Sequence, residues 1–222
     1  MRALLWKDLR LMTYVICLAL ALMAMPYLVS VITWLVKGAP YPLRDSWSLS
    51  AAASSGLSLV SAAFAGGSAL SGERNDGSAR FLAYLPPTRF AIALSKFIVA
   101  AGLLVCVWSG NLLAAGVAVS LTPASNGSAP VIAQVPHPAL IAAGLMVFGV
   151  SWFFSSFMPT TGLPAFIAIL VQMIVILIAP VFAIDLNSRQ AIAGLAGAEA
   201  CIGITGIIGG TLVFLWYNEL NS

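Results

Sequence analysis

The sequence predicts an all-α integral membrane protein with a single domain. Hydrophobic residues make up 61% of its 222 residues and charged residues only 8%, whereas about a quarter of a soluble domain is charged. The mean hydropathy is +1.02, and the apolar residues gather in runs of about 20, the length that crosses a bilayer as one helix. One polar stretch, residues 71–96, holds six of the charged residues and interrupts these runs.

Six apolar runs are long enough to cross a membrane. They cover residues 13–36, 48–70, 97–121, 139–158, 163–184 and 198–216. We expect Pro26 to kink the first span, so that a neighbouring helix has to bond the carbonyl that a proline leaves free. We also expect a tight turn over residues 159–162, which makes the fourth and fifth spans a helical hairpin.

Residues 1–12, MRALLWKDLRLM, predict an amphipathic helix at the membrane interface, ahead of the first span. In a helix, the apolar side chains of this segment share one side and its basic side chains another. They are Leu4, Leu5, Leu9 and Met12 against Lys7 and Arg10. A plain basic tail is the alternative. We do not expect a cleaved signal peptide, because the first span is longer than a signal core and no small-x-small site follows it.

Small residues recur four positions apart in two of the spans, and this spacing lets helix backbones approach closely. The pairs are Ala62/Gly66, Ala63/Gly67 and Gly206/Gly210. We expect them to pack helices within the chain rather than between two copies. Cys17, Cys106 and Cys201 form no ligand motif, and we expect them to serve as apolar packing residues.

Positive charge sets the expected orientation, because an even number of spans places both termini on one side. The basic residues on that side are Arg2, Lys7, Arg10, Arg74, Arg80, Arg89 and Lys96. Only Lys37, Arg44 and Arg189 lie on the other side. The positive-inside rule therefore predicts that both termini and the 71–96 loop are cytoplasmic. We expect the membrane to be the bacterial inner membrane.

The polar stretch of residues 71–96 predicts a short helix in water. Asp76 or Ser78 can cap its start, and Pro86 ends it, because proline lacks the N–H that a helix interior needs. Thr88 can cap the helix that follows. A short polar helix between two spans cannot sit in lipid, so it has to lie at the water interface.

This stretch also carries a family resemblance. Residues 73–89 read ERNDGSARFLAYLPPTR, and a lysine precedes the next span. The arrangement resembles the permeases of ATP-binding-cassette (ABC) transporters of the type-two exporter class. The matching residues are Glu73, Arg74, Gly77, Ser78, Leu82, Leu85, Pro86, Thr88, Arg89 and Lys96. Two positions depart from the family pattern, since Arg80 stands where glutamate is usual and Ala83 where leucine is common.

The resemblance implies a coupling helix in this loop, which docks on a separate ATPase subunit that holds ATP and Mg²⁺. The residues expected at this contact are Glu73, Arg74, Gly77, Ser78, Arg80, Phe81, Tyr84, Leu85, Pro86 and Arg89. It further implies two permease copies, which we expect to be a homodimer, working with two ATPases. It also implies short outer helices within residues 185–197 that dip into the membrane.

Polar groups inside the spans are candidates for the translocation pathway, because placing them in lipid is costly. They are Asn111, Gln172 and Glu199. Glu199 is the single acid within a predicted span and lies near the outer end of that span. It is either an interfacial carboxylate that reaches water or a pathway residue. Asn111 and Gln172 are expected to bond neighbouring helices.

The sequence lacks the usual signs of catalysis. It has no G-x-x-x-x-G-K-[ST] loop for ATP, and its sole histidine, His137, falls in a predicted outer loop. The net charge of +3, without basic runs and interleaved aromatics, gives no sign of nucleic-acid binding. We therefore predict a permease subunit of an ABC exporter, with no enzyme activity or cofactor of its own. The alternatives are a membrane scaffold or assembly factor with the same fold, and a membrane-embedded enzyme.

Overall fold

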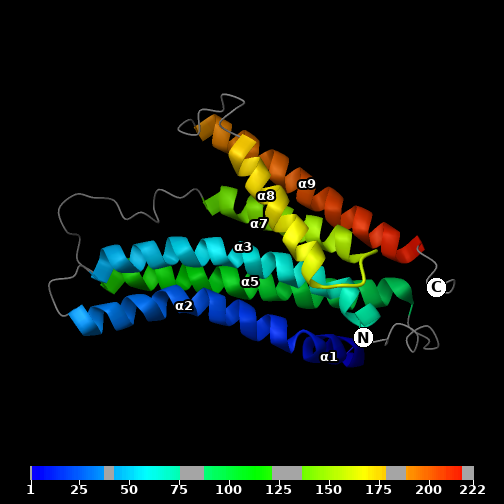
Figure 1. Ribbon diagram of the computed structural model, residues 1–222, viewed down its shortest axis with the longest axis horizontal. Helices are drawn as coiled ribbons and strands as arrows, with labels where there is room; N and C mark the ends of the chain where they lie inside the picture. Colours follow the sequence, from blue (N-terminus) through cyan, green and yellow to red (C-terminus); the bar gives the residue numbers. More distant parts are fainter. Residues whose placement is uncertain (1, 38–42, 76–87, 122–136, 179–188, 217–222) are drawn as a thin grey trace.

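The computed structural model describes residues 2–37, 43–75, 88–121, 137–178 and 189–216 (Figure 1). Within these ranges the chain forms seven helices and no strand, which confirms the all-α prediction. Five of the helices are long and apolar enough to cross a membrane, so the protein is membrane-embedded.

The helices follow the predicted apolar runs. In chain order they are α1 (Arg2–Leu11), α2 (Thr13–Lys37), α3 (Leu43–Asn75), α5 (Arg89–Leu121), α7 (His137–Ser155), α8 (Gly162–Ile178) and α9 (Arg189–Trp216). The segments long enough to span a membrane are Thr13–Val36, Leu49–Ser71, Arg89–Ala114, Pro138–Ser155 and Ala191–Trp216. The helix predicted at the N-terminus is present as α1. Thr88 caps α5 as predicted, since its hydroxyl accepts the Ala91 N–H at 3.2 Å.

The fifth predicted span is described only in part, and the sixth differs from the prediction. The described part of α8 has 17 residues, which at about 1.5 Å per residue is shorter than the roughly 30 Å hydrocarbon core, so the count of six spans stays a prediction. α9 begins at Arg189 rather than near residue 198. Residues 189–197, which we expected in separate short helices, instead form the first turns of α9. This alanine-rich segment has no proline to end a helix.

Contacts along the helices give their directions. α3 runs antiparallel to α2 and to α5, and these three helices lie side by side in Figure 1. α7 and α9 run parallel, because Gly203 packs against Leu145 and, further along both helices, Gly210 packs against Phe153. The chain between α7 and α9 therefore has to return along the bundle, and α8 lies in that connection. A short turn joins α7 to α8, as the predicted hairpin requires.

The predicted small-residue pairs pack helices within the chain. A Cβ on Gly66 would lie 2.6 Å from the carbonyl oxygen of Phe148, and one on Gly206 would lie 2.6 Å from that of Gly149. Real Cβ atoms essentially never come so close to backbone atoms, so α3 and α9 can approach α7 only through glycine. The expectation of intramolecular packing is confirmed for these residues.

α2 continues as one helix through Pro26. Two hydroxyls of α3 donate to carbonyls of α2 beside the proline: Ser54 to Met23 at 3.0 Å and Ser50 to Pro26 at 2.9 Å. The expected bond to the carbonyl that Pro26 leaves free, that of Leu22, stays a prediction.

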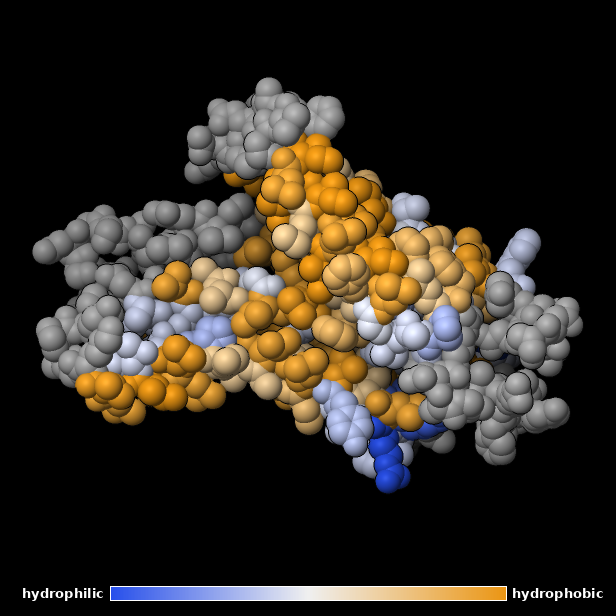
Figure 2. Space-filling model, in the orientation of Figure 1, coloured by the Kyte–Doolittle hydropathy of each residue, from blue (hydrophilic) through white to orange (hydrophobic). Residues whose placement is uncertain are grey.

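The outward faces of the helices are apolar (Figure 2). Large exposed hydrophobic side chains line α2 from Met25 to Val36 and α8 from Leu163 to Ile178, which is the surface that lipid would cover. Cys17, Cys106 and Cys201 lie exposed on these outer surfaces. The thiols were expected to serve as apolar packing residues, and they lie among the outward side chains rather than in the buried core.

Candidate functional site

Most of the predicted coupling residues lie outside the described residues. These are Gly77, Ser78, Arg80, Phe81, Tyr84, Leu85 and Pro86. Glu73 and Arg74 belong to the last turn of α3, and Arg89 is the exposed first residue of α5. The coupling helix and its contact with an ATPase stay predictions.

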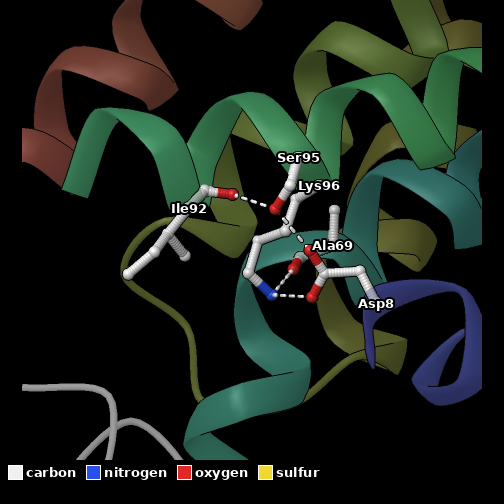
Figure 3. A network of polar contacts seen from close by, with 5 residues as sticks. All are labelled: Asp8, Ala69, Ile92, Ser95 and Lys96. Atoms are coloured by element: carbon white, nitrogen blue, oxygen red, sulfur yellow. Dashed lines mark hydrogen bonds and ion pairs between the residues drawn. The ribbon is translucent and has the colours of Figure 1, made fainter. Parts of the chain in front are cut away.

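The two helices that flank this loop are described, and a polar network joins them near the loop. The end of α3, the start of α5 and α1 lie toward the same end of the bundle (Figure 1). Figure 3 shows Asp8 of α1 pointing toward Ser95 and Lys96 of α5, with the carbonyl of Ala69 of α3 beside the lysine. Three separate helices thus meet at one point.

The network combines short hydrogen bonds to charged groups with one longer ion pair. The Lys96 ammonium donates to the Ala69 carbonyl at 2.9 Å and lies 3.8 Å from Oδ1 of Asp8. The Ser95 hydroxyl donates to Oδ2 of Asp8 at 2.5 Å and also lies 2.9 Å from the carbonyl of Ile92. Both carboxylate oxygens of Asp8 therefore face groups on α5.

The network is buried, so the positions of the three helices have to keep its charged groups paired. The side chains of Asp8 and Lys96 are each 4% exposed. An apolar pair of similar volume often gives equal or greater stability, whereas loss of one partner leaves a buried charge without compensation. The pair therefore contributes less to net stability than to the register in which α1, α3 and α5 meet.

In the sequence, Lys96 reads as one of the cytoplasmic charges, and Asp8 and Ser95 belong to no motif. A signal for Asp8 was present, because it lies one helical turn from Leu4 and from Met12, on the apolar side of α1. An acid in such a stripe calls for a partner, since unpaired carboxylates are almost never buried. Nothing in the sequence placed that partner on α5.

Asn111 joins three helices deeper in the bundle. Its amide donates to the Ser55 hydroxyl of α3 at 2.7 Å, and its side-chain oxygen accepts the Tyr27 hydroxyl of α2 at 2.5 Å. Asn111 itself is on α5 and is 8% exposed. The expectation that it bonds neighbouring helices is confirmed.

Gln172 of α8 and Glu199 of α9 form a second buried contact. The Gln172 amide donates to Oε1 of Glu199 at 3.0 Å, and the two residues are 6% and 4% exposed. Gln172 therefore bonds a neighbouring helix as expected. Glu199 is buried against Gln172, and its assignment to the membrane interface or to the pathway stays a prediction. The structure brings Glu199 to Gln172 and places Asn111 in a different helix contact.

Comparison with family models, with characterised proteins and with solved structures gives no match for this chain. Among the residues that the structure describes, no group of three or more His, Cys, Asp or Glu side chains is placed to hold a metal ion.

Proposed function

We propose that this chain is the permease subunit of an ABC exporter, which moves substrate across the membrane with ATP hydrolysed by a separate ATPase subunit. The observation that carries the proposal is the network of Asp8, Ser95 and Lys96 with the Ala69 carbonyl. It ties together the two helices that flank residues 76–87, the segment with the family's coupling pattern. A displacement of that segment would move α1, α3 and α5 together, because the network joins them.

The loop has the composition of a docking element. Phe81, Tyr84 and Leu85 give it an apolar edge that water alone does not explain, while Glu73, Arg74 and Arg80 supply charges to set the register on a partner. ATP-driven closure of two ATPases would move two such loops together. We infer a homodimer in the bacterial inner membrane, with cytoplasmic termini and the route between its two copies.

The composition of the spans bears on the substrate class. They are mostly apolar, and most of the buried polar residues are serines, which suits lipid-like or amphiphilic cargo. Glu199 and Gln172 are the polar groups we assign to the route. Asn111, which ties α2, α3 and α5 together, is better suited to holding the helices in place.

The test is association with the ATPase. Replacing Phe81 and Tyr84 with Ala should weaken binding of the ATPase by about 1–2 kcal/mol or more, as expected for aromatic anchors at an interface. Co-purification with the ATPase and its turnover in the complex should fall together. Trp6→Ala is the matched control, because Trp6 is an exposed aromatic residue of α1, at the same end of the bundle.

Two outcomes contradict the proposal. If the double variant binds and stimulates the ATPase like wild type, the loop does not couple the two subunits. If the wild-type chain binds an ATPase whose turnover never responds to it, the chain acts as a scaffold or assembly factor.

A further inference from the structure

The contact between Gln172 and Glu199 leaves one acceptor without a donor. The Gln172 amide nitrogen donates to Oε1 of Glu199 at 3.0 Å. Its own side-chain oxygen is fully buried and has no hydrogen-bond partner within the described part of the chain. A buried acceptor in this state is costly, and native structures contain few of them.

The same contact leaves Glu199 without a counter-charge. It is the only charged residue in residues 97–121, 138–178 and 190–216, which include the parts of α5, α7, α8 and α9 around it. Residues 46–71 of α3, the helix that packs against α8, contain no charged residue at all. The basic groups of these helices lie near their ends.

The basic residues of the helices around Glu199 are Arg189 on α9, His137 on α7, Arg89 and Lys96 on α5, and Arg44 and Arg74 on α3. Lys96 belongs to the network with Asp8. Arg189 lies about 15 Å from Glu199 along the helix axis. His137 is the first residue of α7.

One proton on Glu199 would supply the missing donor for the Gln172 oxygen and would also remove the uncompensated charge of the carboxylate. An ionised carboxylate buried without a cation is so unfavourable that the group takes up a proton instead. The neutral acid has one O–H donor and one carbonyl acceptor, which complement the carbonyl and the N–H of a primary amide. A protonated Oε2 of Glu199 can therefore donate to the orphan oxygen of Gln172 while Oε1 keeps the existing bond.

The need for a proton does not depend on how the amide is oriented. If the oxygen and nitrogen of Gln172 are exchanged, two acceptor oxygens face each other at the 3.0 Å that now separates nitrogen and oxygen. Only a proton between them makes that separation favourable.

We propose that Glu199 and Gln172 form a proton-binding site between α8 and α9, in which Glu199 is a neutral acid that donates to Gln172. This site goes beyond the proposed transport function and exists whether or not the chain works with an ATPase. Release of the proton would leave a bare carboxylate against α8, so the contact between α8 and α9 depends on its occupancy.

Infrared spectroscopy of the purified chain in lipid bilayers at pH 7 tests the proposal directly. We expect the carbonyl stretch of a protonated carboxyl, with the shift that exchange into D₂O gives. Glu199→Gln, which keeps the shape and the neutral charge, should remove this band. Gln172→Leu should move it to higher frequency, because the acid loses its acceptor. Glu73→Gln, which removes an acid of the loop segment, should leave the band intact.

Absence of the band from the wild type, or its survival in Glu199→Gln, overturns the proposal. The measurement is repeated in buffers of sodium, potassium and choline at equal ionic strength. A band present in choline and lost in sodium or potassium also overturns it, because a metal cation rather than a proton then occupies the site.

Discussion

The ammonium of Lys96 lies 3.8 Å from a carboxylate oxygen of Asp8, and each side chain is 4% exposed. The pair joins α1 to the start of α5, and the Ala69 carbonyl adds the end of α3 to the same point. A buried pair of this kind is costly to break, because the remaining charge has no water to solvate it.

Lys96→Met should therefore lower the free energy of unfolding by about 3–5 kcal/mol, because it leaves Asp8 buried without its partner. Denaturant unfolding in mixed micelles measures the loss. The double variant Asp8→Leu with Lys96→Met should recover most of it, since apolar residues of similar volume replace such pairs well. Arg10→Gln, which removes an exposed cation of α1, is the control. A single variant as stable as wild type would show that the pair does not form.

Gly149→Val should destabilise the contact between α7 and α9. A Cβ at Gly149 would overlap the carbonyl of Gly203, and neither backbone can yield without moving its helix. We expect a loss of about 1–3 kcal/mol or more in unfolding free energy. Gly102→Val is the control, because a Cβ there meets nothing within 4 Å. Equal stability of the two variants would contradict the close approach of the helices.

Asn111→Leu should cost about 1–2 kcal/mol, since it removes the acceptor of the Tyr27 hydroxyl and the donor to Ser55. Ser109→Leu, at an exposed position of the same helix, should be near neutral. The same unfolding assay compares them. If Asn111→Leu is the more stable of the two, the hydrogen bonds contribute nothing measurable.

Single cysteines at Ser78 and Ser125 should label from opposite sides of the membrane, in a background that lacks the three native cysteines. Membrane-impermeant maleimide, applied to intact cells and to inverted vesicles, reads out the side. The positive-inside count places Ser78 in the cytoplasm. Labelling of both positions from one side would rule out six spans with cytoplasmic termini.

Glu199→Gln should lower transport while expression and ATPase binding stay at wild-type levels. The amide keeps a polar partner for Gln172 but cannot take up or release a proton. Transport by the complex in proteoliposomes, assayed with an amphiphilic fluorescent probe, gives the comparison. A rate equal to wild type would assign the contact to structure alone.

The sequence was informative where one local rule acted alone. Runs of apolar residues located the helices, Thr88 began α5 as a cap residue should, and the small-xxx-small spacing located the seams against α7. Asn111 and Gln172 were also identified correctly as residues that bond neighbouring helices, because an amide inside a span needs a hydrogen-bond partner. The partner of Gln172, however, is a residue of another helix and could not be read from either segment.

Tertiary contacts decided the rest. Lys96 reads as a solvated charge before a span, yet α1 packs over it and supplies Asp8. α9 starts at Arg189, earlier than predicted, because residues 191–198 are apolar and rich in alanine and continue the helix and the apolar run of the span. The longer helix places Glu199 ten residues from the start of α9, where Gln172 of α8 faces it.

The parallel arrangement of α7 and α9 fixes an order of assembly during membrane insertion. α7 leaves the translocation machinery with Gly149 exposed, and its partner Gly203 is not yet synthesised. Two parallel neighbours cannot meet until the chain between them has travelled back, so α8 has to be in place before the tightest helix contact can close. α9 therefore packs against α7 only after α8 is in place. A chain stalled before Arg189 would expose to lipid, or to quality-control proteases, a glycine face built for another helix.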